Sequence, residues 1–239
     1  VHELPDYPGL LSRRLQACGY ATGYTGKWHL GFGPDAAGHP EYERHVRDVP
    51  LLAYARHGGS LPSTIGYEGD DFPGHGGSGM HTPAYRQWLL DQGRELTTET
   101  VIDYYPDVFE VTSGSNTTVS WFLADRAIEQ IETFSARGRP FFTMLNFWGP
   151  HSPYHASTEY VDRYRNTTFT PWPSFGDHSP SKPSIHAAHR TEHLRHWPWE
   201  SFETCLRYYY AAVTEIDAQL GRVLSAPEKS GQMERTLIV

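Results

Sequence analysis

The sequence predicts an α/β fold with a mainly parallel sheet, because a helical pattern is followed by a strand-like run three times along the chain. The three pairs are residues 8–18 with 20–25, 118–138 with 141–147, and 199–224 with 236–239. The run at 141–147 is almost entirely apolar, which is typical of a strand that helices cover on both faces. Crossover helices of this kind join neighbouring parallel strands.

The first helix and strand lead into a short segment bracketed by glycines. Pro8 suits the first turn of a helix, and Gly19 is expected to end it. Residues 20–25 then carry Tyr and Thr, which favour strands. Residues 26–31 (Gly-Lys-Trp-His-Leu-Gly) are expected to form a loop at the carboxyl end of this strand.

The second and third helices are predicted from apolar side chains that recur at helical spacing. These side chains are Trp121, Ala124, Ala127, Ile128, Ile131 and Phe134 in one helix, and Phe202, Leu206, Tyr209, Val213, Ile216, Leu220 and Val223 in the other. The second helix leads into the strand at 141–147 and a polar loop at 148–154. The third leads into 236–239, which is expected to begin another strand.

Two segments, 32–115 and 155–198, are predicted as loop-rich excursions from the sheet. The first is rich in Gly, Pro, His and Asp and carries one short helical candidate at 85–92. Long loops on a rigid scaffold frequently build substrate pockets, and this is the role we expect for residues 32–115.

Composition excludes some functions. The formal net charge of −8 argues against a nucleic-acid partner, and no stretch approaches the roughly 18 apolar residues that a membrane span needs. Cys18 and Cys205 are expected to be buried free thiols, with a disulfide between them as the alternative. Asn116 and Asn166 lie in Asn-Thr-Thr sequons. The chain begins with Val and ends inside a strand-like run, so we expect both ends to be internal to a longer protein.

Polar residues follow two of the predicted strands, where an open α/β sheet binds its ligands. Lys27 and His29 follow the first strand, and His151, flanked by prolines, follows the second. Lys27 and His29 alternate across Trp28, so in an extended segment both side chains point to the same side. An ammonium group can hold an oxygen of a sulfate or phosphate while an imidazole moves a proton. We predict Lys27, His29 and His151 as the catalytic residues.

Three segments, in order, resemble parts of one known family. Residues 19–31, Gly-Tyr-Ala-Thr-Gly-Tyr-Thr-Gly-Lys-Trp-His-Leu-Gly, resemble the second signature of the formylglycine-dependent (type I) sulfatases, in the alkaline-phosphatase superfamily. Residues 141–154 resemble the family's strand ending in P-H-x-P. Residues 208–217 resemble the helix before the strand that ends in S-D-H-G or S-D-N-G.

The resemblance implies an alkaline-phosphatase-like α/β/α sandwich, incomplete here, with residues 1–239 as part of a sulfatase catalytic domain. It implies that Lys27 contacts the sulfate and the formylglycine, and that His29 assists breakdown of the sulfated intermediate. His151 would bind the sulfate or protonate the leaving alcohol. The implied activity is hydrolysis of a small-molecule or glycan sulfate ester, and the family resemblance favours a periplasmic, secreted or lysosomal compartment.

The same resemblance implies a calcium ion and a formylglycine, whose residues this sequence lacks. Neither Cys18 nor Cys205 fits C-x-P-x-R, and the family's paired N-terminal aspartates, the Asp and Asn or His after the third strand, and a final lysine are missing. We therefore expect the full-length protein to be a sulfatase and this chain alone to be inactive, since covalent catalysis needs an activated nucleophile.

Two other functions stay open: a phosphomono- or phosphodiesterase of the same superfamily, and a non-catalytic relative that binds sulfated glycans. Lys27 and His29 could belong to a solvated loop, and His151 could be a surface histidine. A metal site is disfavoured at five clustered histidines and at two adjacent aspartates in a Gly-rich loop. These are His178, His186, His189, His193, His196, Asp70 and Asp71. His155 is predicted as a turn residue, with a place in the lining of the site as the alternative. Asp217 is predicted as a structural residue that bonds a neighbouring element.

Overall fold

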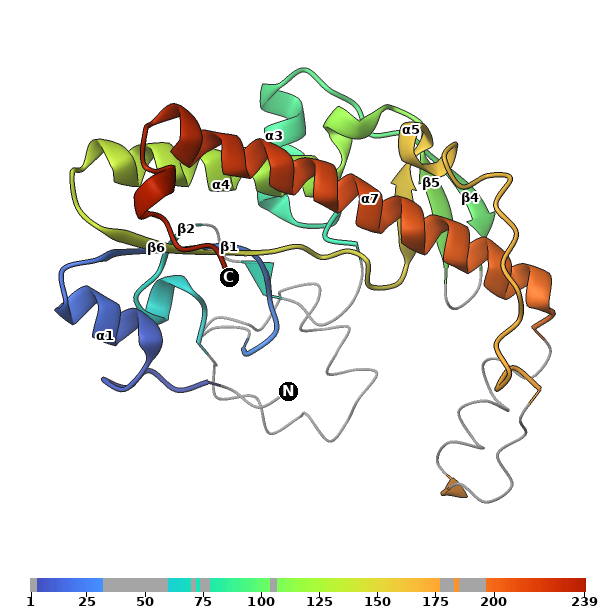
Figure 1. Ribbon diagram of the computed structural model, residues 1–239, viewed down its shortest axis with the longest axis horizontal. Helices are drawn as coiled ribbons and strands as arrows, with labels where there is room; N and C mark the ends of the chain where they lie inside the picture. The colour runs from blue at the N-terminus through green and yellow to red at the C-terminus, as the bar shows by residue number, and fades with distance from the viewer. Residues whose placement is uncertain are drawn as a thin grey trace.

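A computed structural model describes residues 4–31, 60–69, 72–73, 78–103, 107–176, 183–184 and 197–239 (Figure 1). Strand β1 (Ala21–Trp28) organises the main sheet and pairs in parallel with β6 (Phe141–Asn146). It also pairs in parallel with the two-residue strands β2 (Glu68–Gly69) and β3 (Phe72–Pro73). This parallel sheet confirms the predicted fold class.

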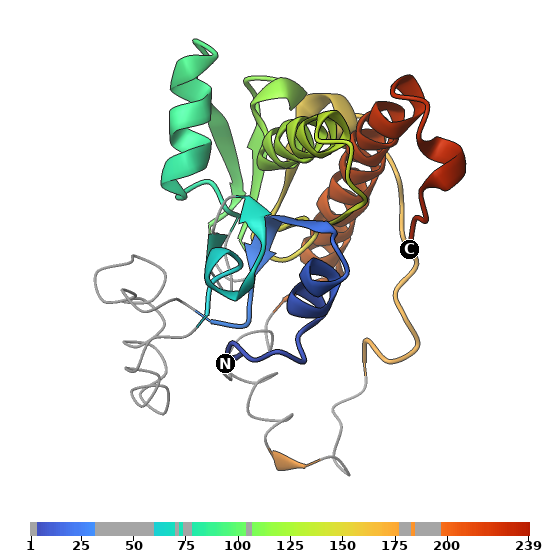
Figure 2. The ribbon, with the colours of Figure 1, turned by 90° about the vertical axis from the view of Figure 1, so that its left-hand side faces the viewer.

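Helices lie on both faces of the main sheet, with α1 (Leu11–Ala17) on one side and α4 (Val119–Ala136) on the other (Figure 2). Side chains of β1 point alternately toward the α1 layer and toward the α4 layer. Tyr24 packs in a buried cluster next to α1, whereas Gly23 lies directly against Gln130 of α4. The three layers are the α/β/α arrangement that the family resemblance implies.

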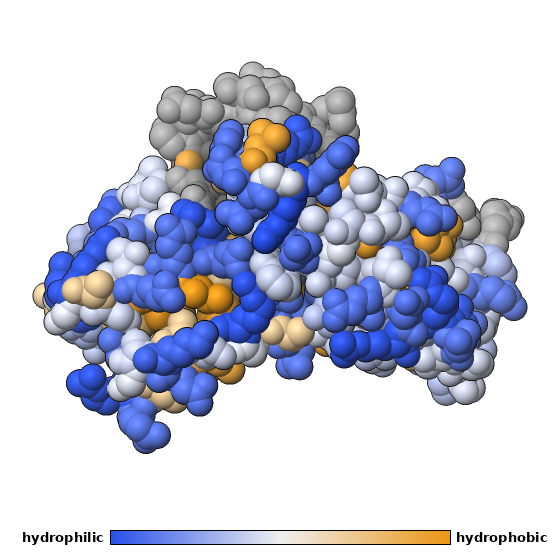
Figure 3. Space-filling view, turned by 90° about the horizontal axis from the view of Figure 1, so that it is seen from above, coloured by the Kyte–Doolittle hydropathy of each residue, from blue (hydrophilic) through white to orange (hydrophobic). Residues whose placement is uncertain are grey.

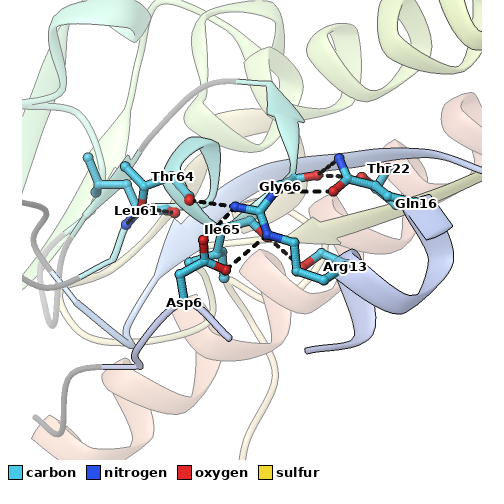
Figure 4. Close-up of polar contacts among 9 residues, drawn as sticks. Asp6, Arg13, Gln16, Thr22, Leu61, Thr64, Ile65 and Gly66 are labelled. Carbon is cyan, nitrogen blue, oxygen red and sulfur yellow. Dashed lines mark hydrogen bonds and ion pairs between the residues drawn. The ribbon is translucent and has the colours of Figure 1, made fainter. Parts of the chain in front are cut away.

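Helix α1 is fastened to the 3₁₀ turn η2 (Ser63–Ile65) by side chains that donate to backbone carbonyls (Figure 4). Ser12 Oγ donates to Ile65 O at 2.6 Å, and Gln16 Nε2 donates to Gly66 O at 2.7 Å. Thr22 of β1 donates to the same Gly66 carbonyl at 2.5 Å. These bonds hold helix, turn and strand together at the amino-terminal half of β1.

The long helix α7 (Trp199–Lys229) joins the main sheet to a second, smaller sheet (Figure 1). The carboxyl-terminal half of α7 packs on α4 through Val223 and Ala226. Its amino-terminal half packs on strand β7 and the following α5. Figure 3 shows the upper surface of the molecule in the orientation of Figure 1. This surface is mostly hydrophilic, with hydrophobic residues in small patches.

The second sheet was not predicted. It contains β4 (Thr98–Ile102) antiparallel to β5 (Val108–Val111), and β5 is parallel to β7 (Tyr154–Ser157), which α5 (Thr158–Val161) follows. These short elements are regular structure that the sequence did not predict within or beside the excursions at 32–115 and 155–198. Almost all side chains of β4 are exposed, so no apolar alternation marks it as a strand. The helical candidate at 85–92 is confirmed by α3 (Pro83–Asp91).

Several predicted boundaries were also wrong. Strand β1 runs on to Trp28, so the first part of the expected loop at 26–31 belongs to the strand. Helix α7 runs past residue 224, through Pro227, to Lys229. Residues 236–239 follow the 3₁₀ turn η5 (Met233–Arg235) and form no strand, since no strand that the structure describes pairs with them.

Burial differs from the prediction at two positions. Strand β6 is half-buried along its length, not fully buried, because β1 is the one strand paired with it in the described part of the chain. Cys205 is buried as predicted, but Cys18 is exposed at the end of α1, and both cysteines are free thiols. No helix in the described ranges is long and apolar enough to cross a membrane.

Candidate active site

A pocket of about 520 Å³ lies at the carboxyl ends of β1 and β6. Its walls come from three places: the end of β1, the end of β6 with the loop that follows it, and one turn of α7. The lining residues are Lys27, His29, Leu145, Asn146, Phe147, Gly149, Pro150, Val213 and Ile216. Parallel pairing of β1 with β6 brings these segments together, because the carboxyl ends of parallel strands meet at the same edge.

Lys27 and His29 reach the same pocket because the chain is extended around Trp28. Trp28 is 3% exposed and points the other way, where its indole ring meets Tyr24 edge-on and its Nε1 donates to Ser60 O at 2.7 Å. Alternation in an extended chain then directs the neighbours on either side of Trp28 toward the pocket. Lys27 and His29 therefore lie on the same side of the chain, as their alternation across Trp28 predicts.

Tyr24 ties the two strand ends together beneath the pocket. Its hydroxyl donates to the carbonyl oxygen of Lys27 at 2.6 Å and accepts a short hydrogen bond from the side-chain amide of Asn146. Burial raises the pKa of Tyr24 to about 12, because a phenolate would lose its hydration. The phenol therefore stays neutral and can donate throughout the physiological range.

Trp148 and His81 are two residues near the site that the sequence analysis missed. The Nζ atom of Lys27 lies 5.3 Å from the centre of the Trp148 ring, over its face. The ring of His81 meets Trp148 edge-on at 5.8 Å. Trp148 could have been predicted from the sequence, because it lies at the start of the loop that carries His151. His81 belongs to no sequence pattern that indicates the site.

His151 lies immediately after the pocket-lining Gly149 and Pro150 but does not line the pocket itself. It is exposed, and its Nδ1 lies 2.5 Å from the carbonyl oxygen of Ser152. The Gly149–Pro150 and Ser152–Pro153 peptide bonds are both cis. His151 thus stands beside the pocket, on the loop that forms one wall of it.

His155 is in strand β7 and not in a turn, so that prediction was wrong. Its ring stacks on Phe109 at 4.7 Å, and its Nδ1 lies 2.9 Å from Pro153 O. Burial lowers the pKa of His155, because a charged imidazolium would lose its hydration. His155 belongs to the second sheet and does not line the pocket.

The structure describes only one of the remaining candidates, Asp217. Asp217 is exposed on α7 and does not line the pocket. Asp70, Asp71 and the five histidines between 178 and 196 lie outside the described residues. Within the described ranges, no group of three or more His, Cys, Asp or Glu side chains could hold a metal ion. These residues therefore do not by themselves fit the calcium ion that the resemblance implies.

The layered parallel sheet has the arrangement of the alkaline-phosphatase-like fold. The chain belongs to the sulfatase family, whose family model matches residues 2–239.

Two curated relatives carry sulfatase names. An uncharacterised sulfatase of Schizosaccharomyces pombe is 27% identical over 168 residues, which are 67% of this chain and 26% of that protein. Arylsulfatase G of Mus musculus is 27% identical over 155 residues, which are 64% of this chain and 27% of that protein. The match spans about a quarter of the length of each relative.

Two solved structures share the fold. One is a sulfatase-type protein, yidJ, from Bacteroides fragilis, with a TM-score of 0.51 and 19% identity, covering 97% of this chain and 42% of that one. The other is a phosphonate monoester hydrolase from Silicibacter pomeroyi, with a TM-score of 0.59 and 17% identity. This match covers 95% of this chain and 45% of that one. At these identities the likeness supports the alkaline-phosphatase-like fold and carries no information about the substrate.

Proposed function

We propose that the full-length protein hydrolyses sulfate esters at the pocket between the carboxyl ends of β1 and β6. The main observation behind the proposal is that Lys27 and His29 line one pocket. This pocket lies at the edge where an α/β sheet binds its ligand. Membership of the sulfatase family supports the choice of sulfate as the anion.

Each residue has a role that suits its chemistry. The ammonium group of Lys27 is a compact positive charge with three donors, and it would hold the sulfate oxygens as charge develops on them. The exposed imidazole of His29 would move a proton during breakdown of the sulfated intermediate. His151, beside the pocket, would bind the sulfate or protonate the leaving alcohol.

The resemblance also implies a formylglycine nucleophile and a calcium ion. Neither cysteine of this chain lies in the C-x-P-x-R context of a formylglycine precursor. The described residues do not fit a calcium ion. Both would come from residues outside this sequence. A periplasmic, secreted or lysosomal location of the full-length protein is part of the same proposal.

The test is to purify the full-length protein and assay 4-nitrophenyl sulfate, 4-nitrophenyl phosphate and a phosphonate monoester side by side. We expect turnover of the sulfate ester to exceed that of the other two, and the 239-residue chain alone to turn over none of them. Faster turnover of a phosphorus ester would favour the phosphatase alternative. Binding of a sulfated glycan by a full-length protein that hydrolyses nothing would favour the non-catalytic alternative and overturn the proposal.

A further inference from the structure

Trp148 is held rigidly beside the pocket. It is 3% exposed and packs in a core cluster with Tyr85, Leu89 and Phe122, from α3 and α4. The indole ring also lies against Gly79, where an added Cβ would come 2.8 Å from Trp148 Cδ1. A side chain enclosed in this way keeps one orientation, because a closely packed core leaves no room for another rotamer.

The ammonium group of Lys27 lies over one face of this buried ring. The 5.3 Å separation of Lys27 Nζ from the ring centre is within the range of a cation–π interaction. A lysine side chain has four flexible carbons and loses much rotamer freedom when it is held in one place. A fixed aromatic face lowers that cost at the moment of substrate binding, because the ammonium group is already placed.

The chemistry of the contact also suits an anion site. The indole ring has no net charge, so its contact with the ammonium group does not itself neutralise the charge of Lys27. Trp148 is also linked to the neighbouring loop, because its carbonyl oxygen accepts from the backbone N–H of His151 at 3.4 Å.

From these contacts we infer that Trp148 is a positioning residue that acts through Lys27 and holds its ammonium group toward the sulfate-binding pocket. This inference rests on the proposed function for its catalytic consequence. The placement of Lys27 on the ring can be tested separately from activity.

The activity test uses the full-length enzyme and 4-nitrophenyl sulfate. We expect Trp148→Leu to lower kcat/KM about tenfold, the scale of losing a desolvated cation–π contact, and Trp148→Phe to lower it only about threefold. In the Lys27→Ala background, Trp148→Leu should have almost no further effect. Equal losses in both backgrounds would overturn the inference, since they would show a structural role independent of Lys27.

Trp88→Leu is a matched control for loss of a core tryptophan. Trp88 packs against the same cluster and carries Arg94 over its ring at 5.1 Å, but it lines a separate groove between α3 and α4. We expect this variant to lose stability without a change in kcat/KM for the folded enzyme. A loss of kcat/KM equal to that of Trp148→Leu would contradict a specific role for Trp148.

A second measurement does not depend on activity. The three lysines of the sequence are Lys27, Lys182 and Lys229, so acetylation by acetic anhydride can be followed at each by mass spectrometry. Trp148→Leu should raise the labelling rate of Lys27 several-fold and leave that of Lys229 unchanged. An unchanged rate at Lys27 would overturn the inference even if the enzyme is an active sulfatase. A raised rate in a protein without sulfatase activity would refute the proposed function alone.

Discussion

The carboxylate of Glu215, on α7, accepts a hydrogen bond from the backbone N–H of Ser157 at 2.9 Å, where β7 passes into α5. Both residues are buried, and Glu215 is only 2% exposed. Burial raises the pKa of Glu215, because the charged carboxylate loses its hydration. One buried acid therefore connects the long helix to the second sheet, and its protonation is linked to folding.

This linkage predicts a pH dependence of stability. Because the folded protein binds the Glu215 proton more tightly than the unfolded chain, the contribution of this group to stability is complete below the unfolded-state pKa. It is lost as pH rises through the raised folded-state pKa. Glu215→Gln keeps an acceptor for Ser157 N–H without the charge, so it should unfold at a higher temperature than the wild type at pH 8.

The measurement is thermal unfolding of the full-length protein from pH 4 to pH 8. The advantage of Glu215→Gln should grow with pH, whereas Glu234→Gln, an exposed control on η5, should follow the wild type. Glu215→Ala removes the acceptor and should cost about 1–3 kcal/mol at low pH. This cost should shrink as pH rises, because the wild type then loses the contribution of Glu215. Parallel curves for the wild type and Glu215→Gln would refute the linkage.

Substitution of the pocket residues should affect turnover more than stability. Lys27→Ala and His29→Ala are each expected to lower kcat of the full-length enzyme on 4-nitrophenyl sulfate by on the order of 10², because each loses an oxyanion contact or a positioned acid or base. Lys229→Ala, at the exposed end of α7, is the matched lysine control and should retain wild-type turnover. Wild-type turnover by folded Lys27→Ala would exclude Lys27 from the chemistry.

Tyr24→Phe should loosen the junction of β1 and β6 without adding or removing a charge. The variant loses the bond to Lys27 O and leaves the amide of Asn146 without its phenol partner, at a cost of about 1–2 kcal/mol in unfolding free energy. We expect a several-fold loss of kcat/KM and an unchanged shape of the pH–rate profile below pH 9, since the pKa of Tyr24 is about 12. Urea titration and initial rates measure the two effects. A shift of the alkaline limb below pH 9 would contradict a neutral, structural phenol.

Two glycines form a matched pair for a stability test. Gly26 has φ of +109°, and an added Cβ would lie 1.8 Å from the carbonyl oxygen of Asn146 on the paired strand. Gly26→Ala should therefore cost about 3 kcal/mol or more. Gly221, within α7, has nothing within 4 Å of an added Cβ, so Gly221→Ala should stabilise by about 1 kcal/mol. Equal midpoints for the two variants in urea would show that the strands separate to accept the methyl group.

The sequence by itself determined the helices and strands in which apolar residues recur at the spacing of a helix or a strand. The apolar stripe at 118–138 predicts α4, and the alternation of Lys27, Trp28 and His29 predicts that the outer two share a side. The alternation of helices and strands predicts an α/β fold with a mainly parallel sheet. These features are local, because each depends on neighbours within a few residues along the chain.

Only the tertiary structure decided which distant segments meet. Strand β4 is mostly exposed and forms because β5 supplies its hydrogen bonds, whereas the apolar residues 236–239 form no strand because nothing described pairs with them. The contact of Trp148 with Lys27 joins side chains of β1 and of the loop after β6, which are far apart in sequence. Strand pairing and ring contacts of this kind depend on groups brought together by the whole fold, and no local period in the chain encodes them.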